Sequence, residues 1–298
     1  MQSRKLMQAV LALAALCSLA QTSLAQEKPY REHTTPFPWK PHVSGDKDLT
    51  NTYPYWQDRK AIKGEWAESR ENSWKLNWKY MDASVDGNLN GGHVALDRGK
   101  VLYESLNQSN ALAACLGAPG GDLKGLRAGY PRFNKALGHV AGLEETIAHC
   151  AGRQQVTLEH GSYDNSAVSV YVASFSNGMP IKIDVVNKGP LRDAFVRGKE
   201  RFEVRVGASN FACASCHVGL VGKQLRGQVP TTPYGDASHW PLYRTRGELM
   251  SMQVRFVECN RNSGVQPLQL GAKAYTDLEV FLTALTNGYP VDVPTARD

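Results

Sequence analysis

The sequence predicts a mainly α-helical protein built from two tandem domains of similar fold, with a short β insertion and an extended N-terminal arm. Three observations support this prediction: an internal repeat, a single CxxCH pentapeptide in the second copy, and an amphipathic helix pattern near the C-terminus. The predicted segments are a cleaved leader at 1–25, the arm at 26–95, the first domain with the β segment at 96–190, and the second domain at 191–298.

The internal repeat is weak in identity but keeps the same order of features in both copies. RGKVLYE at Arg98–Glu104 resembles RGKERFE at Arg197–Glu203, and each lies upstream of a cysteine. Further on, YPRF at 130–133 and WPLY at 240–243 precede another cysteine by twenty and nineteen residues, counted from the first residue of each motif. Both halves therefore follow the order helix, cysteine site, aromatic-proline turn, helix, cysteine.

The pentapeptide CASCH, Cys213–His217, is the attachment signature of a c-type haem. Its two thiols can bond to the two vinyl groups of one porphyrin, and His217 is placed to ligate the iron from the proximal side. A zinc knuckle is the alternative, but zinc needs further Cys or His ligands at close spacing, and the next twenty residues contain none. We therefore expect one covalent haem c and a duplicated cytochrome c-like fold.

The N-terminus has the pattern of a secretory signal peptide. Arg4 and Lys5 precede an apolar run at 6–20, and Ser23-Leu24-Ala25 offers small residues for cleavage. The run is too short to span a membrane, and no later segment approaches the necessary length. We expect a soluble mature chain in an oxidising compartment, most simply the bacterial periplasm.

The charge balance excludes few partners. Loss of the leader leaves 32 basic and 28 acidic residues, a net charge of about +4. The chain has no basic run interleaved with aromatic residues, so we expect no nucleic-acid binding.

The first copy of the repeat has lost the residues that hold a haem. Aligning Cys115 with Cys216 puts Leu112 at the position of the first thioether cysteine and Leu116 at that of the proximal histidine. Cys115 and Cys150 then flank the missing cofactor, and two neighbouring thiols in an oxidising compartment form a disulfide. This bond would close a loop of about 35 residues and partly replace the haem as a source of stability.

Other segments give local predictions. Alternation of β-branched and polar residues at 155–186 predicts short strands or a hairpin, and a helix is expected at 66–80 within the arm. Near the C-terminus, Thr276 and Glu279 form a capping-box pattern before an apolar helical face that ends at Asn287-Gly288.

One cysteine remains without an assigned partner. Cys17 leaves with the leader, two cysteines hold the haem and two form the predicted disulfide, so Cys259 is left over. It is either a buried, inert cysteine or a distal haem ligand. Met250 and Met252 are alternative ligands, although core packing suits them better, and His239 is a third candidate that we expect to lie in a surface loop.

Arg255 lies four residues before Cys259 and hence on the same helical face. A guanidinium there stabilises a thiolate and can bind an oxyanion through paired donors, which suits chemistry on a small anionic sulfur compound. The alternatives are a solvated helix charge or a partner of a haem propionate.

Three motifs carry a specific resemblance to a known family. FEVRVGASNFACASCHVGL at 202–220, MQVRFVECN at 252–260 and DLEVFLTALTNGYP at 277–290 resemble the A subunit of the SoxAX cytochrome, the L-cysteine S-thiosulfotransferase of bacterial thiosulfate oxidation. The resemblance covers most of the mature chain. Some members have two CxxCH motifs, whereas this chain resembles the single-haem branch, with Cys115 and Cys150 as a disulfide remnant.

The resemblance implies roles for the residues singled out above. Cys259 matches the distal haem ligand and catalytic residue, often carried as a persulfide, and Arg255 matches the substrate-binding arginine. Cys213, Cys216 and His217 match the covalent and proximal ligands. The implied partners are thiosulfate, a small cytochrome c subunit, SoxX, in a heterodimer, and the SoxYZ carrier protein as sulfur acceptor.

Two functions from other classes compete with the enzyme. One is an electron-transfer cytochrome with Met250 or Met252 as distal ligand and a buried Cys259. The other is a thiolate-ligated redox or gas sensor. A sulfur adduct on Cys259 distinguishes the enzyme from both.

Overall fold

The structure is a computed structural model that describes residues 91–220, 225, 230, 233–244 and 247–297. All of them belong to a single compact unit. The predicted leader, the helix expected at 66–80 and the arm up to residue 90 lie outside the described residues. The arm was expected to extend to residue 95, but a helix already begins at Gly91.

The first half of the described chain contains eight elements in the predicted order. They are α4 (Gly91–Leu106), η2 (Gln108–Asn110), α5 (Ala111–Cys115), η3 (Arg127–Gly129), β1 (Arg132–Asn134), β2 (His139–Ala141), α6 (Leu143–Gly152) and α7 (Tyr163–Ser174).

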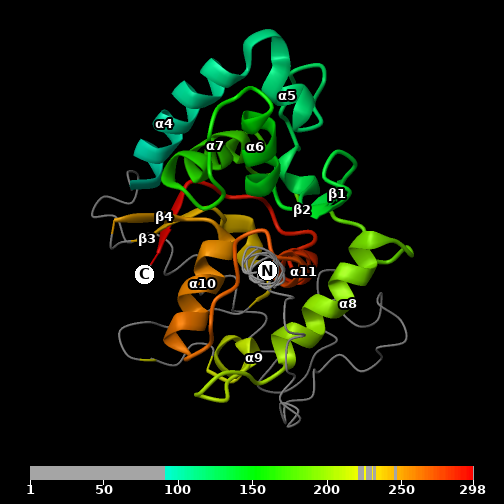
Figure 1. Cartoon of the computed structure of the whole chain (residues 1–298), viewed down its shortest axis with the longest axis vertical. Helices are drawn as coiled ribbons and strands as arrows, with labels where there is room; N and C mark the ends of the chain where they lie inside the picture. Colours follow the sequence, from blue (N-terminus) through cyan, green and yellow to red (C-terminus); the bar gives the residue numbers. More distant parts are fainter. Residues whose placement is uncertain (1–90, 221–224, 226–229, 231–232, 245–246, 298) are drawn as a thin grey trace, which may run out of the picture. The chain divides into compact units, whose positions relative to one another are not determined.

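The second half repeats this order without a described counterpart of η2 and adds a final strand (Figure 1). Its elements are α8 (Pro190–Glu203), α9 (Cys213–His217), η4 (Asp236–His239), β3 (Leu242–Arg244), β4 (Glu248–Met250), α10 (Met252–Asn262), α11 (Lys273–Ala284) and β5 (Thr295–Arg297). The tandem arrangement is therefore confirmed. The boundary after residue 190 stays a prediction, although α8 begins there.

A glycine from each RGK motif allows two long helices to pack closely in both halves. α4 packs along α7, and α8 packs along α11 (Figure 1). A Cβ atom on Gly99 would lie 2.0 Å from the carbonyl oxygen of Ala167, and one on Gly198 would lie 2.0 Å from that of Asp277. Real Cβ atoms do not approach so closely, so only glycine fits either crossing. Glycine at the same position of the RGK motif thus permits the close helix packing in both halves.

The arginine of each RGK motif also ties the two packed helices together. Arg98 donates from Nε and Nη2 to the two carboxylate oxygens of Asp164, at 3.0 and 2.8 Å. Arg197 donates likewise to Asp277, with both distances at 2.7 Å. The planar guanidinium matches a carboxylate in two-point fashion, which fixes the rotation of each helix pair.

The predicted β insertion at 155–186 is wrong in its middle part, because residues 163–174 form helix α7. Ser162 caps this helix by accepting a hydrogen bond from the Asn165 backbone N–H at 3.2 Å. Most residues of α7 are buried on all sides, including Ser166 and Ser169. The alternation of serine and valine therefore reflects a helix that is buried on several faces, rather than a strand with one solvent-exposed face. Small serines allow close contact with its neighbours.

The segment after α7 is extended, and it pairs with the C-terminal region instead of forming a hairpin. The Ile181 N–H donates to the Tyr289 carbonyl at 2.9 Å, and the Gly178 N–H donates to the Val291 carbonyl at 2.8 Å. These contacts form isolated bridges at Asn177 and Pro180.

Each half contains one small sheet, and its hairpin precedes the helix that holds Cys150 or Cys259. β1 pairs antiparallel with β2, so that Phe133 faces Val140 in register. β3 pairs antiparallel with β4 and parallel with β5, in the order β4-β3-β5. Each hairpin leads directly into the next helix, α6 or α10.

The C-terminal helix α11 is confirmed, but its predicted cap is wrong. The helix starts at Lys273, with Ala272 as its N-cap, so Thr276 and Glu279 lie inside it and are buried. Their polar atoms face Gln253 of α10: the Gln253 Nε2 donates to Glu279 Oε2 at 2.8 Å and to Thr276 Oγ1 at 3.5 Å. The two residues that resemble a capping box thus form a tertiary contact between α10 and α11.

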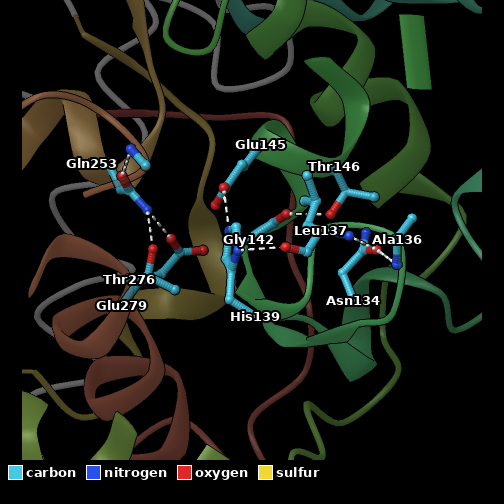
Figure 2. Close-up of polar contacts among 11 residues, drawn as sticks. Asn134, Ala136, Leu137, His139, Gly142, Glu145, Thr146, Gln253, Thr276 and Glu279 are labelled. Carbon is cyan, nitrogen blue, oxygen red and sulfur yellow. Dashed lines mark hydrogen bonds and ion pairs between the residues drawn. The ribbon is translucent and has the colours of Figure 1, made fainter. Parts of the chain in front are cut away.

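Glu279 also links α10 and α11 to the first half of the chain (Figure 2). Its carboxylate lies against Gly142, where a Cβ atom would be 2.7 Å from Oε1, at the start of α6. Burial, followed by the nearby Glu144 carboxylate, raises the pKa of Glu279 to about 8. Arg127, which is buried and donates to the Ala237 carbonyl at 2.9 Å, opposes this rise. The junction between the halves is therefore polar and buried around Glu279, while apolar clusters join the halves elsewhere.

Each half has its own apolar core. In the first, Leu112, Leu116, Leu143 and Ile147 are at most 1% exposed. The core of the second contains Phe195, Phe202, Tyr275, Phe281, Met250, Met252 and Phe256. Among the described helices, none combines the length and hydrophobicity that a membrane span requires.

Candidate haem and sulfur site

The pentapeptide CASCH forms the short helix α9, which packs against α8. Ser215 Oγ accepts a hydrogen bond from the Ala212 backbone N–H at 3.0 Å. A side chain of the pentapeptide itself therefore stabilises the first turn of the helix. Cys213 and Cys216 are partly exposed and are not part of any disulfide, although they lie three residues apart. His217 is the last residue of the helix and directly follows Cys216.

Helix α10 supplies the second side of the site. Ser251 caps it by accepting from the Val254 backbone N–H at 3.3 Å. Residues 248–250 form β4, and the helix starts at Met252. Arg255 and Cys259 lie one helical turn apart, as the spacing predicted.

The structure brings the three described cysteines outside the disulfide into one electrostatic cluster. Desolvation by the surrounding protein, followed by the nearby Cys259, raises the pKa of Cys213 to about 12. The same two causes, in the same order, raise the pKa of Cys216. Cys213 and Cys216 from α9 therefore lie close enough to Cys259 of α10 to interact electrostatically, although 43 residues or more separate them in sequence.

This environment fits a c-type haem. A thioether sulfur has no proton to lose, so the desolvation that hinders ionisation of Cys213 costs nothing once that sulfur is bonded to a vinyl carbon. The donor set is also suitable, since CxxCH supplies both thioethers and an imidazole, and Cys259 adds a sulfur from the neighbouring helix. The residues predicted to hold the cofactor are thus compatible with it.

Arg255 is a cation of the site, and its guanidinium is held in place by Glu258. Burial lowers its pKa, but Cys259 and Glu258 oppose this effect and leave the pKa raised. The Arg255 Nη1 donates to Glu258 Oε2, one helical turn along α10. The Arg255 side chain is only 19% exposed. It is therefore not a solvated helix charge, and it remains cationic beside Cys259.

The structure gives each alternative distal ligand a packing role. Met250 and Met252 are 6% and 5% exposed and belong to the apolar core of the second half, which suits the packing role. His239 was expected in a surface loop, but it is fully buried in η4. Its Nδ1 lies 3.5 Å from an Asp292 carboxylate oxygen, and its carbonyl accepts from Thr295 Oγ1 at 3.1 Å. His239 is thus tied to the C-terminal strand.

The predicted disulfide of the first half is present. Cys115 and Cys150 are bonded, with their Cα atoms 5.9 Å apart. The two sulfurs come from α5 and α6, the elements that correspond to α9 and α10, and their bond joins these two helices directly. Leu112 and Leu116 are fully buried at the positions of the missing ligands.

Sequence reasoning missed two charged neighbours of the site. Glu258 could have been found, because its spacing of three residues from Arg255 places both on one helical face. Arg201 lowers the pKa of Cys213 and lies over the Tyr275 ring at 6.0 Å. It precedes the pentapeptide by twelve residues in a separate helix, and no local pattern connects the two.

Comparisons with known proteins agree with this geometry. A family model described as the cytochrome c domain of SoxA and TsdA matches residues 98–181, the half that lacks CxxCH. The L-cysteine S-thiosulfotransferase subunit SoxA of Chlorobaculum thiosulfatiphilum is 31% identical over 225 residues, 74% of each chain. The chain belongs to the SoxA family. The SoxA subunit of Allochromatium vinosum is 30% identical over 171 residues, which cover 56% of this chain and 61% of that one.

A solved structure extends the SoxA relationship to the fold. The match is to the crystal structure of SoxXA from P. pantotrophus, with a TM-score of 0.60 and 23% identity, over 80% of this chain and 87% of that one. The fold shared with a SoxA structure confirms the tandem cytochrome c-like architecture, and the family-model match identifies the half with the disulfide as a cytochrome c domain.

Proposed function

We propose that this chain is the catalytic, haem c-binding subunit of a periplasmic L-cysteine S-thiosulfotransferase, which joins thiosulfate oxidatively to a cysteine of the carrier protein SoxYZ. The observation that carries the proposal is the placement of Cys259 between a fixed arginine and the two thiols of CxxCH. The curated relatives bear this activity in their names.

Haem c is assigned to the CxxCH half. Cys213 and Cys216 would hold it covalently, and His217 and Cys259 would be its axial ligands. Bound there, the haem supplies a one-electron acceptor next to the reacting sulfur. We propose one haem per chain, because the corresponding positions of the first half carry Leu112 and Leu116.

Cys259 is proposed as the sulfur relay. Its thiolate bonds to the outer sulfur of thiosulfate, which gives a cysteine S-thiosulfonate and releases two electrons. The carrier thiolate then attacks that same sulfur and displaces the Cys259 thiolate. The products are the carrier S-thiosulfonate and the regenerated relay, so the second step needs no further oxidant. The relay residue Cys259 can also hold one additional sulfur atom as a persulfide.

Arg255 is proposed to hold the sulfonate end of thiosulfate. Its Nη1 is engaged by Glu258, which orients the planar group along the helix. Charge-assisted contacts to a sulfonate oxygen place the outer sulfur toward Cys259, one turn away. A cation here also favours the thiolate form of Cys259.

The electron balance calls for a partner. Forming the sulfur–sulfur bond removes two electrons, whereas one haem accepts one, so we propose a small cytochrome subunit, SoxX, as partner in a heterodimer. The match to a solved SoxXA structure supports this assembly. The Cys115–Cys150 disulfide supports an oxidising compartment, in line with the proposed periplasmic location after signal-peptide cleavage.

The experiment that tests the proposal is Cys259→Ser, with Met250→Leu and Met252→Leu as controls. We expect Cys259→Ser to retain covalent haem, change the distal-ligand spectrum and lose transfer of thiosulfate to the carrier thiol. Both methionine variants should keep spectrum and activity. Peptide mass analysis of the wild type should find a sulfur adduct on Cys259. Unchanged activity in Cys259→Ser, or a spectrum lost only in a methionine variant, would favour the electron carrier instead.

A further inference from the structure

The disulfide of the haem-free half borders a surface pocket of about 390 Å³. The pocket is formed by the ends of α5 and α6 and is lined by Ala111, Ala114, Cys115, Cys150, Arg153 and Gln154. The two alanines carry no side chain beyond Cβ, which leaves space beside the sulfur atoms. A small molecule in this pocket thus reaches a covalent bond that can be exchanged.

The two cysteines of this bond differ in accessibility. Cys150 is 1% exposed and belongs to the apolar core of its half, whereas Cys115 is partly exposed. A thiolate attacks a disulfide sulfur from the side opposite the leaving sulfur, so the attacked atom has to be reachable from solvent. Access therefore selects Cys115 as the attacked sulfur and Cys150 as the leaving group.

Arg153 gives the pocket a positive charge. It lies just after α6, is exposed, and forms no ion pair with any residue that the structure describes. The guanidinium is available to attract an anion, and it stands three residues after Cys150. A negatively charged thiol is thus favoured over a neutral one at this position.

We propose that the Cys115–Cys150 bond is a thiol–disulfide exchange site for small anionic thiols. The incoming thiolate forms a bond to Cys115 Sγ as the Cys115–Cys150 bond breaks, and the electron pair leaves with Cys150, which takes a proton from water. The product is a mixed disulfide on Cys115 and a buried thiol at Cys150. Cys150 can reverse the step by attacking Cys115 and expelling the small thiol. This site is independent of the transfer reaction proposed for Cys259.

Glutathione, a small anionic thiol, is the probe that tests the proposal on the haem-loaded protein. After incubation, free thiols are blocked with N-ethylmaleimide and the chain is cleaved with trypsin, which separates Cys115 (101–124) from Cys150 (136–153). We expect the glutathione mass on the first peptide and maleimide on the second. Glutathione on Cys150 would overturn the proposal, and so would a disulfide that stays intact where the denatured chain is readily reduced.

Arg153→Gln tests the charge, and Lys135→Gln, on the exposed β1–β2 turn away from the pocket, is the matched control. We expect Arg153→Gln to slow exchange with glutathione several-fold while exchange with neutral 2-mercaptoethanol is unchanged. Lys135→Gln should alter neither rate. An equal effect of Arg153→Gln on both thiols, or none on either, would remove anion selection from the proposal.

Discussion

Cys150 and Cys259 occupy the same position, the eighth residue, of the corresponding helices α6 and α10. In the first half this sulfur is bonded to Cys115, and in the second it lies beside Arg255 and the thiols of CxxCH. The same position of the duplicated fold thus holds a covalent cross-link in one half and, in the other, the cysteine that we propose as the sulfur relay. The surroundings explain the difference, since Cys150 is buried in an apolar core.

We expect one covalent haem per chain. CASCH is the only CxxCH motif of the sequence, and the Cys115–Cys150 bond occupies the corresponding space in the first half. A pyridine haemochrome assay on purified protein, together with its intact mass, measures the count. Two haems per chain would contradict the assignment of the first half.

Replacing Cys150 by Ser should lower the free energy of unfolding without altering the haem. The bond closes a loop of 35 residues. Chain entropy alone then predicts a loss of about 3 to 4 kcal/mol. Denaturant unfolding measures the stability, and the visible spectrum monitors the haem. Cys115→Ser should behave alike, and full stability in both variants would show that the cross-link is dispensable.

Replacing Arg255 should impair turnover and leave haem content unchanged. Arg255→Lys keeps the charge but loses the planar fork that Glu258 orients, so substrate affinity should fall. Arg255→Ala removes a charge-assisted contact worth about 1.5 to 3 kcal/mol, or roughly one to two orders of magnitude in kcat/KM. Steady-state assays with the carrier protein measure both. Arg261→Ala, an exposed arginine on the same helix, is the control, and wild-type kinetics in the Arg255 variants would dismiss its role.

Glu279→Gln should stabilise the protein most at alkaline pH. The carboxyl has a pKa of about 8 in the fold against 4.5 ordinarily, because burial and Glu144 disfavour its charge. Between these values the unfolded chain has released this proton while the fold retains it, so its contribution lowers stability as pH rises. The side-chain amide that Glu279→Gln introduces carries no such proton, and its oxygen can still accept from Gln253.

The measurement for Glu279 is denaturant unfolding of wild type and variant across this pH range. The charged neighbours Glu144, Glu145 and Arg127 face Glu279 in both proteins, so only the difference between the two is interpreted. Glu104→Gln, on the exposed side of α4, controls for the change in net charge. A difference that does not grow with pH would refute the assigned protonation.

Motifs with strict local chemistry could be predicted from the sequence. The repeat, the CxxCH helix, the spacing of Arg255 and Cys259, and the Cys115–Cys150 pair depend on residue identity and short separations. The structure confirms the pair and the proximity of Arg255 to Cys259. The catalytic and ligand roles of these residues stay predictions that the experiments above test.

Patterns that depend on tertiary surroundings were misread. Alternation in α7 predicted strands, since the sequence does not reveal that a helix is enclosed on several sides. Thr276 and Glu279 resembled a cap because Gln253, their actual partner, lies more than twenty residues away. His239 appeared to be a loop residue because its contacts come from the end of the chain. Long-range partners decided each case.

The pairing of residues 177–183 with 287–291 has a consequence for the history of the chain. The internal repeat predicts two duplicated segments that meet near residue 190, yet the end of the second segment completes the backbone hydrogen bonds of the first. Strand β5 then returns to β3 in its own half. The boundary between the repeated segments therefore differs from the boundary between the sets of residues that are joined by hydrogen bonds. A chain divided near residue 190 would therefore leave both parts without some of their backbone hydrogen-bond partners.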